Sequence, residues 1–364
     1  MKVSFLYGAD LKTLVQLFWQ QRFRLDIRRL PSVLLHFCFA VFNTVISIPE
    51  RFFRWEKDPV SPVFILGHWR SGTTHLHNLM TIDSTFSTPN TFQVAFPHLF
   101  FYSEKWLAPF FDRISPGVRP MDNMAMLMSS ANEEEIALAS LGAPSSYLAI
   151  NFPRDHQRYR TYVSFRTADS KAVDQWKKAY RKYVRKIVAK YGNDRPLVLK
   201  SPANTARVPL LLEMYPDARF IHIHRNPYET LRSTIHLYEA WFDMASFQSL
   251  KELKAGRDTF ILEVYKEMHQ CWFEDQKLIP EGKLLTLRFE DLKKNPVEIM
   301  ETVYQFLGEK KRDKDALEAY LRSLKSYRQN DYDALPPDIM AKINQQMRFV
   351  FDGLGYSLKE SSAI

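Results

Sequence analysis

Cysteine is scarce in this sequence. Only Cys38 and Cys271 occur among 364 residues, and neither belongs to a Cys-x-x-Cys pair or to a Cys/His spacing suited to zinc. A disulfide framework and a structural zinc site are therefore both disfavoured. Because few cysteines are typical of a reducing compartment, we expect a cytoplasmic protein, with membrane association left open.

Internal repeats, low-complexity segments and a leader-like N-terminus are also missing. The one long apolar run, Leu30 to about Ile48, lies too deep for a secretory signal. It follows four arginines, at positions 22, 24, 28 and 29. The run contains Pro31, His36 and Asn43 and is short for a membrane span. We expect foremost a buried helix, then a monotopic helix with its arginines at lipid headgroups, and last a transmembrane helix.

Acidic residues are outnumbered by basic ones. The formal net charge is +9, which favours anionic partners without choosing among nucleotides, membranes and acidic polymers. No nucleic-acid motif is present, so nucleic acid is not an expected partner. Residues 171–191 predict a helix with eight Lys and Arg against one acid, Asp174. We interpret it as a solvated face, with docking to acidic lipid or protein as the alternative.

Short apolar runs alternate with helical segments along most of the chain. The predicted strands cover residues 63–66, 196–199, 220–224 and 283–287, and the helices between and after them cover 73–80, 204–215, 226–238 and 295–307. This alternation predicts an α/β fold, a central parallel sheet flanked by helices. Residues 4–30 also look helical, 92–128 are interpreted as irregular helices and loops, and Ser130 or Asn132 is expected to cap a helix ending near Leu141. We expect a helical N-terminal extension, 1–58, and one catalytic domain, 59–364.

The strongest motif is a glycine-containing turn between a predicted strand and a predicted helix, Gly67-His-Trp-Arg-Ser-Gly-Thr-Thr74. Such a turn directs backbone N–H groups and the helix dipole at one point, which suits a phosphate. Arg70 adds a charged fork, and hydroxyls follow at Ser71, Thr73 and Thr74. The spacing resembles the P-loop, but Thr73 stands where its lysine would reach the β- and γ-phosphates. The motif therefore favours a ligand with a single 5′-phosphate over a nucleoside triphosphate.

A second pair of residues gains weight beside the first motif. Arg225 follows the strand that ends at His224, and Ser233 lies two turns along the next helix. Together they are placed to hold a second phosphate on the same nucleotide. Taken alone, the pair would be an ordinary surface arginine and helical serine.

These blocks resemble the PAPS-dependent sulfotransferases, where PAPS is 3′-phosphoadenosine 5′-phosphosulfate. The segment 62–74 is similar to their 5′-phosphosulfate loop and 218–233 to their 3′-phosphate motif, while 197–202 and 288–292 match further blocks in order. The resemblance covers roughly residues 60–310 and implies a P-loop-like α/β domain that uses PAPS and no metal. By resemblance, the 5′-phosphosulfate is bound by Arg70, Ser71, Gly72, Thr73 and Thr74, and the 3′-phosphate by Arg225 and Ser233.

The catalytic groups depart from the cytosolic branch of that family. Lys200 is similar to its lysine, which stabilises the bridging oxygen, but Pro202 occupies the position of its histidine base. The candidates for the base are Glu133, Glu134 and Glu135, together with His98 and His68. Acids in a first helical turn favour the helix dipole, which explains at least two of the three glutamates without catalysis. A lone histidine among aromatics is more often a structural hydrogen-bonding residue, and we favour Glu133 narrowly over His98.

The acceptor is the least determined part of the hypothesis. The Phe- and Met-rich stretch 92–128 and the apolar N-terminal segment favour a lipophilic alcohol, a sterol or lipid, while a sugar or peptide stays open. Peripheral membrane contact is expected through residues 22–53. Two alternatives are a P-loop kinase or nucleotide hydrolase, and a non-enzymatic basic membrane-docking protein.

Overall fold

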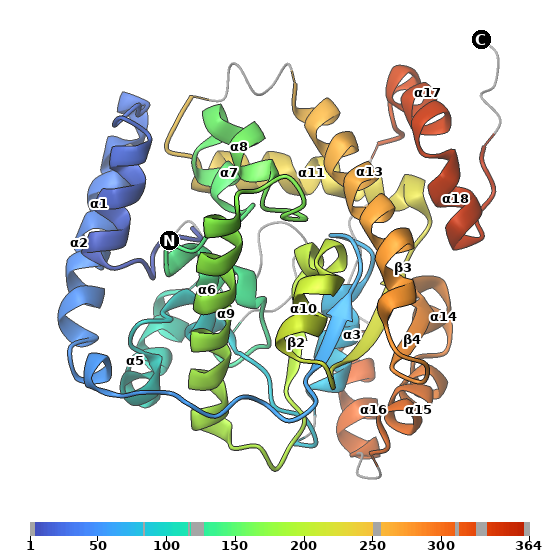
Figure 1. Cartoon of the computed structure of the whole chain (residues 1–364), viewed down its shortest axis with the longest axis horizontal. Helices are drawn as coiled ribbons and strands as arrows, with labels where there is room; N and C mark the ends of the chain where they lie inside the picture. Colours follow the sequence, from blue (N-terminus) through green and yellow to red (C-terminus); the bar gives the residue numbers. More distant parts are fainter. Residues whose placement is uncertain are drawn as a thin grey trace.

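Four parallel strands form the centre of the molecule, in the order β2-β1-β3-β4 (Figure 1). The computed structural model describes residues 4–82, 84–115, 117, 127–249, 256–309, 313–324 and 333–359. The strands are β1 Val63–Leu66, β2 Val198–Lys200, β3 Arg219–His224 and β4 Leu284–Arg288. Phe64 of β1 lies opposite Leu199 on one side and Phe220 on the other. The predicted parallel sheet is confirmed, with strand ends within three residues of those expected.

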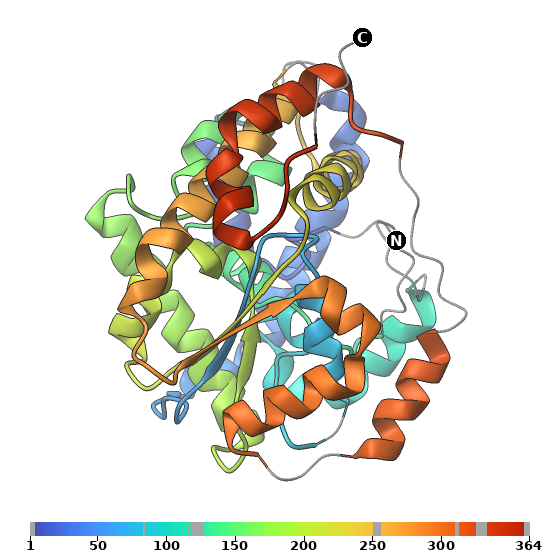
Figure 2. The same ribbon diagram turned by 90° about the vertical axis from the view of Figure 1, so that its right-hand side faces the viewer.

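The two faces of the sheet are covered by different helices. The side chains of Val63 and Ile65 pack with α3 (Thr73–Met80) and α15 (Pro296–Leu307), whereas Phe64 and Leu66 pack with α9 (Ser170–Tyr191) and α10 (Val208–Met214). Figure 2 shows the strands running between these groups of helices. Because successive side chains of a strand point to opposite faces, a strand that is apolar throughout must be covered on both.

The remaining helices complete these layers and build a third core cluster beside the sheet. Their bounds are α1 Leu11–Gln20, α2 Leu30–Ile46, α4 Thr91–Ala95, α5 Phe100–Ile114, α6 Glu134–Ser140, α7 Leu148–Asn151, α8 His156–Arg160, α11 Pro227–Ala245, α13 Arg257–Asp275, α14 Phe289–Lys294, α16 Lys314–Ser323, α17 Pro337–Gln346 and α18 Arg348–Leu354. Short 3-10 turns are η1 Ile27–Arg29, η2 Pro49–Phe52, η3 Pro153–Asp155, η4 Pro202–Ala206 and η5 Gln276–Leu278.

Two local predictions need comment. The stretch 92–128 was expected to hold irregular helices and loops, and it contains helices, of which α5 is a regular helix of 15 residues with Pro109 inside it. Residues 118–126 lie outside the described part. The cap of α6 is Glu133, and Asn132 instead accepts a hydrogen bond from the Glu133 N–H at 2.8 Å. The helix therefore begins later than the polar residues indicated, which leaves the Glu133 side chain for another role.

The N-terminal segment packs against the main body with only one side of its long helix. Phe5, Leu14 and Phe18 are buried in the same core cluster as residues of α11 and α13, together with Val33 and Ala40 of α2. Only 22% of the apolar stretch Ile27–Ile46 is buried, although its length and composition would suffice to cross a membrane. The expected buried helix was therefore wrong for the outer side of α2.

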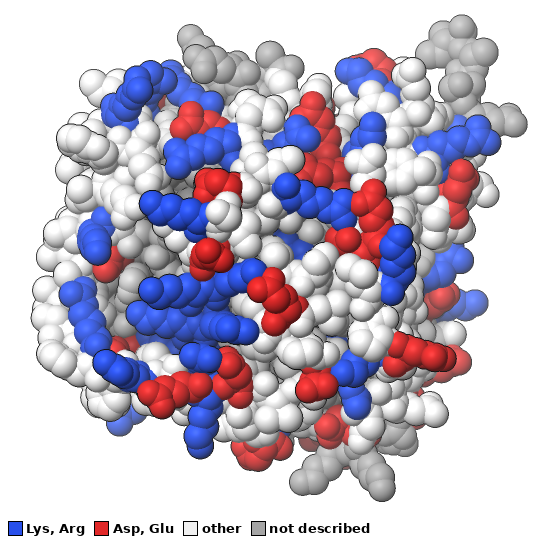
Figure 3. Space-filling model, in the orientation of Figure 1, with Lys and Arg blue, Asp and Glu red and all other residues white. Residues whose placement is uncertain are grey.

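The basic helix α9 is partly neutralised within the molecule. Ion pairs join Lys177 to Glu213 at 2.5 Å and Arg185 to Asp58 at 2.7 Å, and others join Lys186 to Glu50 and Lys190 to Glu104. In Figure 3, Lys and Arg side chains gather over α9 with acidic groups around them. Half of the eight basic residues therefore form ion pairs with acids of the described chain, which favours a structural and solvated face.

Candidate active site

The turn after β1 has a backbone that depends on its two glycines. Gly67 and Gly72 adopt φ values of +143° and +105°, which side chains other than hydrogen disfavour. A Cβ on Gly67 would lie 2.2 Å from the carbonyl oxygen of Ile223, and one on Gly72 would lie 2.2 Å from the Phe289 ring. The loop is therefore pressed against β3 and α14, with Gly72 at the N-terminus of α3.

Hydrogen bonds hold this loop at the ends of the parallel strands. The Gly67 N–H donates to Thr205 Oγ1 at 2.7 Å, and the Ser71 hydroxyl donates to the Ile223 carbonyl at 3.0 Å. Ligands of parallel sheets gather at this edge, the carboxyl ends of the strands. The first turn of α3 adds orphan N–H groups and the positive end of a helix dipole. The arrangement suits an anion with oxygens in several directions.

The structure brings the two predicted phosphate motifs together. Arg70 Nε donates to Ser233 Oγ at 2.9 Å, although 163 positions separate them in the chain. Arg225 lies in the same region. Burial lowers its pKa, Glu229 raises it, and the positive charges of Arg70 and Arg232 lower it. Two guanidinium groups in one region form a natural site for a polyanion.

The residues that contact Arg225 were not recognised in the sequence. Its guanidinium lies over the Phe289 ring, 5.0 Å from the centroid, and an oxygen of Glu229 lies 3.5 Å from it. The adjacent Glu290 accepts a hydrogen bond from the Asn226 N–H at 3.0 Å. Phe289 thus contacts Arg225 and would contact any side chain at Gly72. The block 288–292 was the available signal, since it had been matched to the family without a role.

A second centre is built around the Glu133 carboxylate. Lys200 Nζ lies 2.5 Å from Glu133 Oε1 and 3.4 Å from Thr74 Oγ1, and the Tyr147 hydroxyl donates to Glu133 Oε2. Glu133 is only 9% exposed. Burial raises the pKa of Tyr147 well above its ordinary value, so its hydroxyl stays protonated and donates. A carboxylate and an ammonium therefore lie together beside the loop of residues 67–74, called here the phosphate loop after its predicted ligand.

The two following glutamates are held by other partners. Glu135 accepts hydrogen bonds from Arg207 at 2.7 and 3.1 Å and from Ser145 at 2.7 Å, and both members of its ion pair with Arg207 are fully buried. Glu134 accepts from the Lys200 N–H at 3.0 Å and from the Asn204 amide and Tyr180 hydroxyl at 2.8 Å each. Burial raises the pKa of Glu134 to about 7. Both side chains fasten α6 to its neighbours.

The candidate histidines lie in different surroundings. His98 is near Asp10 and Lys186, and none of the interactions described for it involves the phosphate loop or Lys200; burial lowers its pKa to about 4. His68 belongs to the loop, but its ring lies within 2.9 Å of the Trp69 carbonyl and packs on Tyr265. Burial, with His269 nearby, lowers the pKa of His68 to about 3. Among the contacts of the described residues, Glu133 is the candidate that contacts the side-chain ammonium of Lys200.

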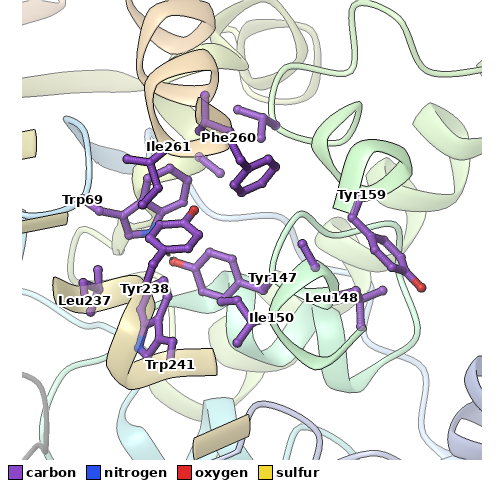
Figure 4. Close-up of a cluster of buried hydrophobic side chains, with 14 of the residues drawn as sticks. Trp69, Tyr147, Leu148, Ile150, Tyr159, Leu237, Tyr238, Trp241, Phe260 and Ile261 are labelled. Carbon is purple, nitrogen blue, oxygen red and sulfur yellow. Dashed lines mark hydrogen bonds between the residues drawn. The ribbon is translucent and has the colours of Figure 1, made fainter. Parts of the chain in front are cut away.

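Trp69, Tyr147 and Trp241 belong to a buried aromatic cluster (Figure 4), which contacts Glu133 through the Tyr147 hydroxyl. Trp69 Nε1 donates to the Tyr147 hydroxyl at 2.8 Å, so the phosphate loop is tied to the same tyrosine as the carboxylate. The Trp241 ring lies 5.6 Å from the Tyr147 ring, and its buried N–H has no acceptor among the described residues. Tyr147 and Trp241 belong to no motif, so only the structure places them near the site.

Comparison with known proteins assigns this arrangement to a family. Residues 62–313 match the model of the Sulfotransferase family. The omega-hydroxy-beta-dihydromenaquinone-9 sulfotransferase Stf3 of Mycobacterium bovis is 28% identical over 356 residues, covering 96% of this chain and 90% of that protein. The Mycobacterium tuberculosis protein of the same name matches equally well.

Solved structures share the fold at lower sequence identity. The sulfotransferase STF9 from Mycobacterium avium superposes with a TM-score of 0.64 at 18% identity, over 82% of this chain and 78% of that one. STF1 from Mycobacterium tuberculosis gives a TM-score of 0.59 at 17% identity, over 85% of each chain. The predicted fold class and family are thereby confirmed, and the kinase and non-enzymatic alternatives are set aside.

Proposed function

The chain belongs to the sulfotransferase family, and from this premise we propose that it moves a sulfuryl group from PAPS to the hydroxyl of a lipophilic acceptor. The single observation that carries the assignment of roles is the joining of two predicted motifs through Arg70 and Ser233. It supports a single anion site formed by the loop after β1 and the first turns of α11.

The residues fit a donor with phosphates at both ends of a ribose. The glycines let the loop pack against β3 and α14, where a Cβ would clash, and the hydroxyls of Thr73 and Thr74 with the Arg70 fork suit the 5′-phosphosulfate. The Ser71 hydroxyl donates to the Ile223 carbonyl, so Ser71 positions the loop. Arg225, stacked on Phe289, and Ser233 suit the 3′-phosphate. When bound, PAPS supplies the sulfuryl group, whose bond to the 5′-phosphate oxygen breaks as the acceptor oxygen bonds to sulfur.

Glu133 is assigned the role of general base, and Lys200 that of stabilising the leaving group. Glu133 takes the proton of the acceptor hydroxyl, which makes its oxygen a better nucleophile. Lys200, which lies beside Thr74, offers an ammonium where negative charge develops on the leaving oxygen. Their 2.5 Å contact orients the carboxylate. Arg70, Lys200 and Arg225 supply the positive charge that the reaction needs, so the proposal assigns no role to a metal.

A lipophilic acceptor is supported by two observations. The relative named above sulfates an omega-hydroxylated menaquinone derivative, by its name. In this chain, the rings of Trp69 and Trp241 pack on the Tyr147 ring, whose hydroxyl donates to Glu133, and aromatic residues of this kind favour apolar ligands. The unmatched Trp241 N–H offers a donor to an acceptor oxygen.

The test is sulfate transfer from PAPS labelled at sulfur, offered in parallel a sterol, a long isoprenoid alcohol, a monosaccharide and a tyrosine-containing peptide. We expect label in one of the first two and in neither of the others. Trp241→Phe removes the N–H while keeping an aromatic ring, and we expect it to raise KM for the acceptor with little change in kcat. Transfer to the sugar or peptide alone would contradict the lipophilic acceptor and leave the sulfotransferase assignment standing.

A further inference from the structure

The strongest unexplained feature is an apolar surface on α1, α2, η2 and α5, at the left in Figure 1. We propose that this surface, called here the docking face, rests on an anionic phospholipid bilayer. The docking face consists of the exposed apolar side chains of segment 15–53 and of α5. Its most exposed members include Trp19, Ile27, Leu34, Val45, Phe52 and Trp106. This role is separate from catalysis and does not depend on the proposed acceptor.

Helix α2 is oriented opposite to a helix that faces water. Its side toward the protein holds His36 and Asn43, which are 1% and 0% exposed, while Leu34 on its outer side is 58% exposed. Asn43 donates to the carbonyls of Tyr7 and Ala9 at 2.7 and 2.9 Å. A surface helix in water normally shows its polar residues outside and its apolar ones inside. The outer side of α2 therefore favours an apolar environment over water.

The exposed apolar side chains are concentrated in one region. Of the 21 large apolar side chains that are exposed among the described residues, thirteen lie in segment 15–53 and four more on α5. The two parts are continuous, because the Phe53 ring lies 5.4 Å from the Tyr102 ring of α5 and the Trp55 ring lies 4.5 Å from the Phe101 ring. A single apolar region of this kind marks an interaction site, whereas scattered exposed residues would not.

The charges around the docking face are mostly positive. Six arginines lie within residues 22–54, near both ends of α2, against only Asp26 and Glu50. Asp26 is bound by Arg28 at 2.8 Å, and Glu50 is buried against Lys186. Figure 3 shows mainly uncharged atoms along the left margin with Lys and Arg beside them. Arginines flanking an apolar face complement the negative headgroups of a bilayer.

The internal contacts of α2 favour a helix lying on the membrane over one crossing it. A crossing helix would lose the Asn43 hydrogen bonds and withdraw Val33 and Ala40 from the core. Docking of a second copy is also less suitable, because a two-fold interface places the same patch on both partners and would oppose their arginines. The bilayer satisfies both the apolar surface and its charge.

The experiment is co-sedimentation with vesicles of phosphatidylcholine containing one quarter phosphatidylglycerol, and with vesicles of phosphatidylcholine alone. The test variant is Leu34→Glu with Val45→Glu, two exposed positions on α2; the matched control is Leu278→Glu, an equally exposed leucine on η5 outside the docking face. We expect the double variant to lose at least about tenfold in vesicle partitioning, since charges are costly in the apolar layer. The control should stay within about twofold of wild type.

Each result decides the proposal. Wild-type binding that depends on phosphatidylglycerol, lost in the double variant and kept in the control, supports it. No sedimentation of wild type with either vesicle, or equal sedimentation of wild type and double variant, overturns it. Sedimentation velocity without lipid provides the remaining outcome: a wild-type dimer that the same two substitutions dissociate, without vesicle binding, would assign the docking face to a second copy. Equal melting temperatures verify that the variants fold.

Discussion

Replacing Glu133 by Gln tests the proposed base with minimal change of shape. The side chain is 9% exposed and contacts Lys200 and Tyr147, so an amide keeps the volume while removing the charge and the basic oxygen. A positioned general base contributes about 100- to 10,000-fold to rate. We therefore expect kcat to fall by that factor, which corresponds to about 3 to 5 kcal/mol of transition-state stabilisation. The loss of a charged hydrogen bond to Lys200 should also lower the free energy of unfolding by about 1.5 to 3 kcal/mol.

The assay measures initial rates at saturating donor and acceptor, well below the melting temperature of the variant. In parallel, calorimetry measures the affinity for 3′-phosphoadenosine 5′-phosphate (PAP), the expected product. Removing a negative charge beside an anion site should leave PAP binding unchanged or tighter. Tyr147→Phe, which keeps the carboxylate and loses one hydrogen bond, serves as the control and should reduce kcat far less. If Glu133→Gln retained kcat within about threefold, general-base catalysis by this residue would be refuted.

Three further predictions follow from the same contacts. Gly72→Ala should weaken PAP binding by at least about tenfold in calorimetry, because its Cβ collides with an aromatic ring. The control is Gly308→Ala, which also has a positive φ but faces open space. It should cost only about 1 kcal/mol of stability and leave PAP binding intact. Glu135→Gln should lower the free energy of unfolding in urea by about 3 to 5 kcal/mol, since it leaves buried Arg207 without its charge partner; a loss below about 1 kcal/mol would contradict the importance of that pair. The pKa of Glu134 in the folded state, about 7, lies above its ordinary value of 4.5, so the folded state binds the proton more tightly than the unfolded state. Stability is therefore lost as pH rises from 4.5 to 7, and wild type should lose about 3 kcal/mol relative to Glu134→Gln over this range. Parallel pH profiles of the two proteins would refute this prediction.

The sheet and the turn formed by residues 67–74 could be predicted because their signals are local, while phosphate binding by that turn stays a prediction. Four apolar strands with helices between them specify layers and direction, and the two glycines of segment 67–74 have a geometric reason that any reader of the sequence can apply. The 3′-phosphate pair depended on family resemblance, since a single Arg and a Ser eight positions later carry little information. The structure supplied what was missing, the contact between Ser233 and Arg70.

The remainder of the site depends on contacts between distant segments. Tyr147 and Trp69 are 78 positions apart, and Glu133 and Lys200 are 67 apart, so neither pair has a spacing that could be recognised. The wrong expectation for α2 has a similar cause. Its outer and inner sides are both largely apolar in sequence, and only the packed structure reveals that His36 and Asn43 point inward.

Binding of PAP to the purified chain, measured by calorimetry without Mg²⁺, tests the central claim most directly. We predict micromolar binding by wild type and a loss of at least about tenfold in both Arg70→Ala and Arg225→Ala, because each removes a charged hydrogen bond to a phosphate. Arg322→Ala, an exposed arginine on α16 paired only with its helical neighbour Glu318 among the described contacts, should bind as wild type does. No binding of PAP, or binding that neither Arg70 nor Arg225 affects, would contradict the account.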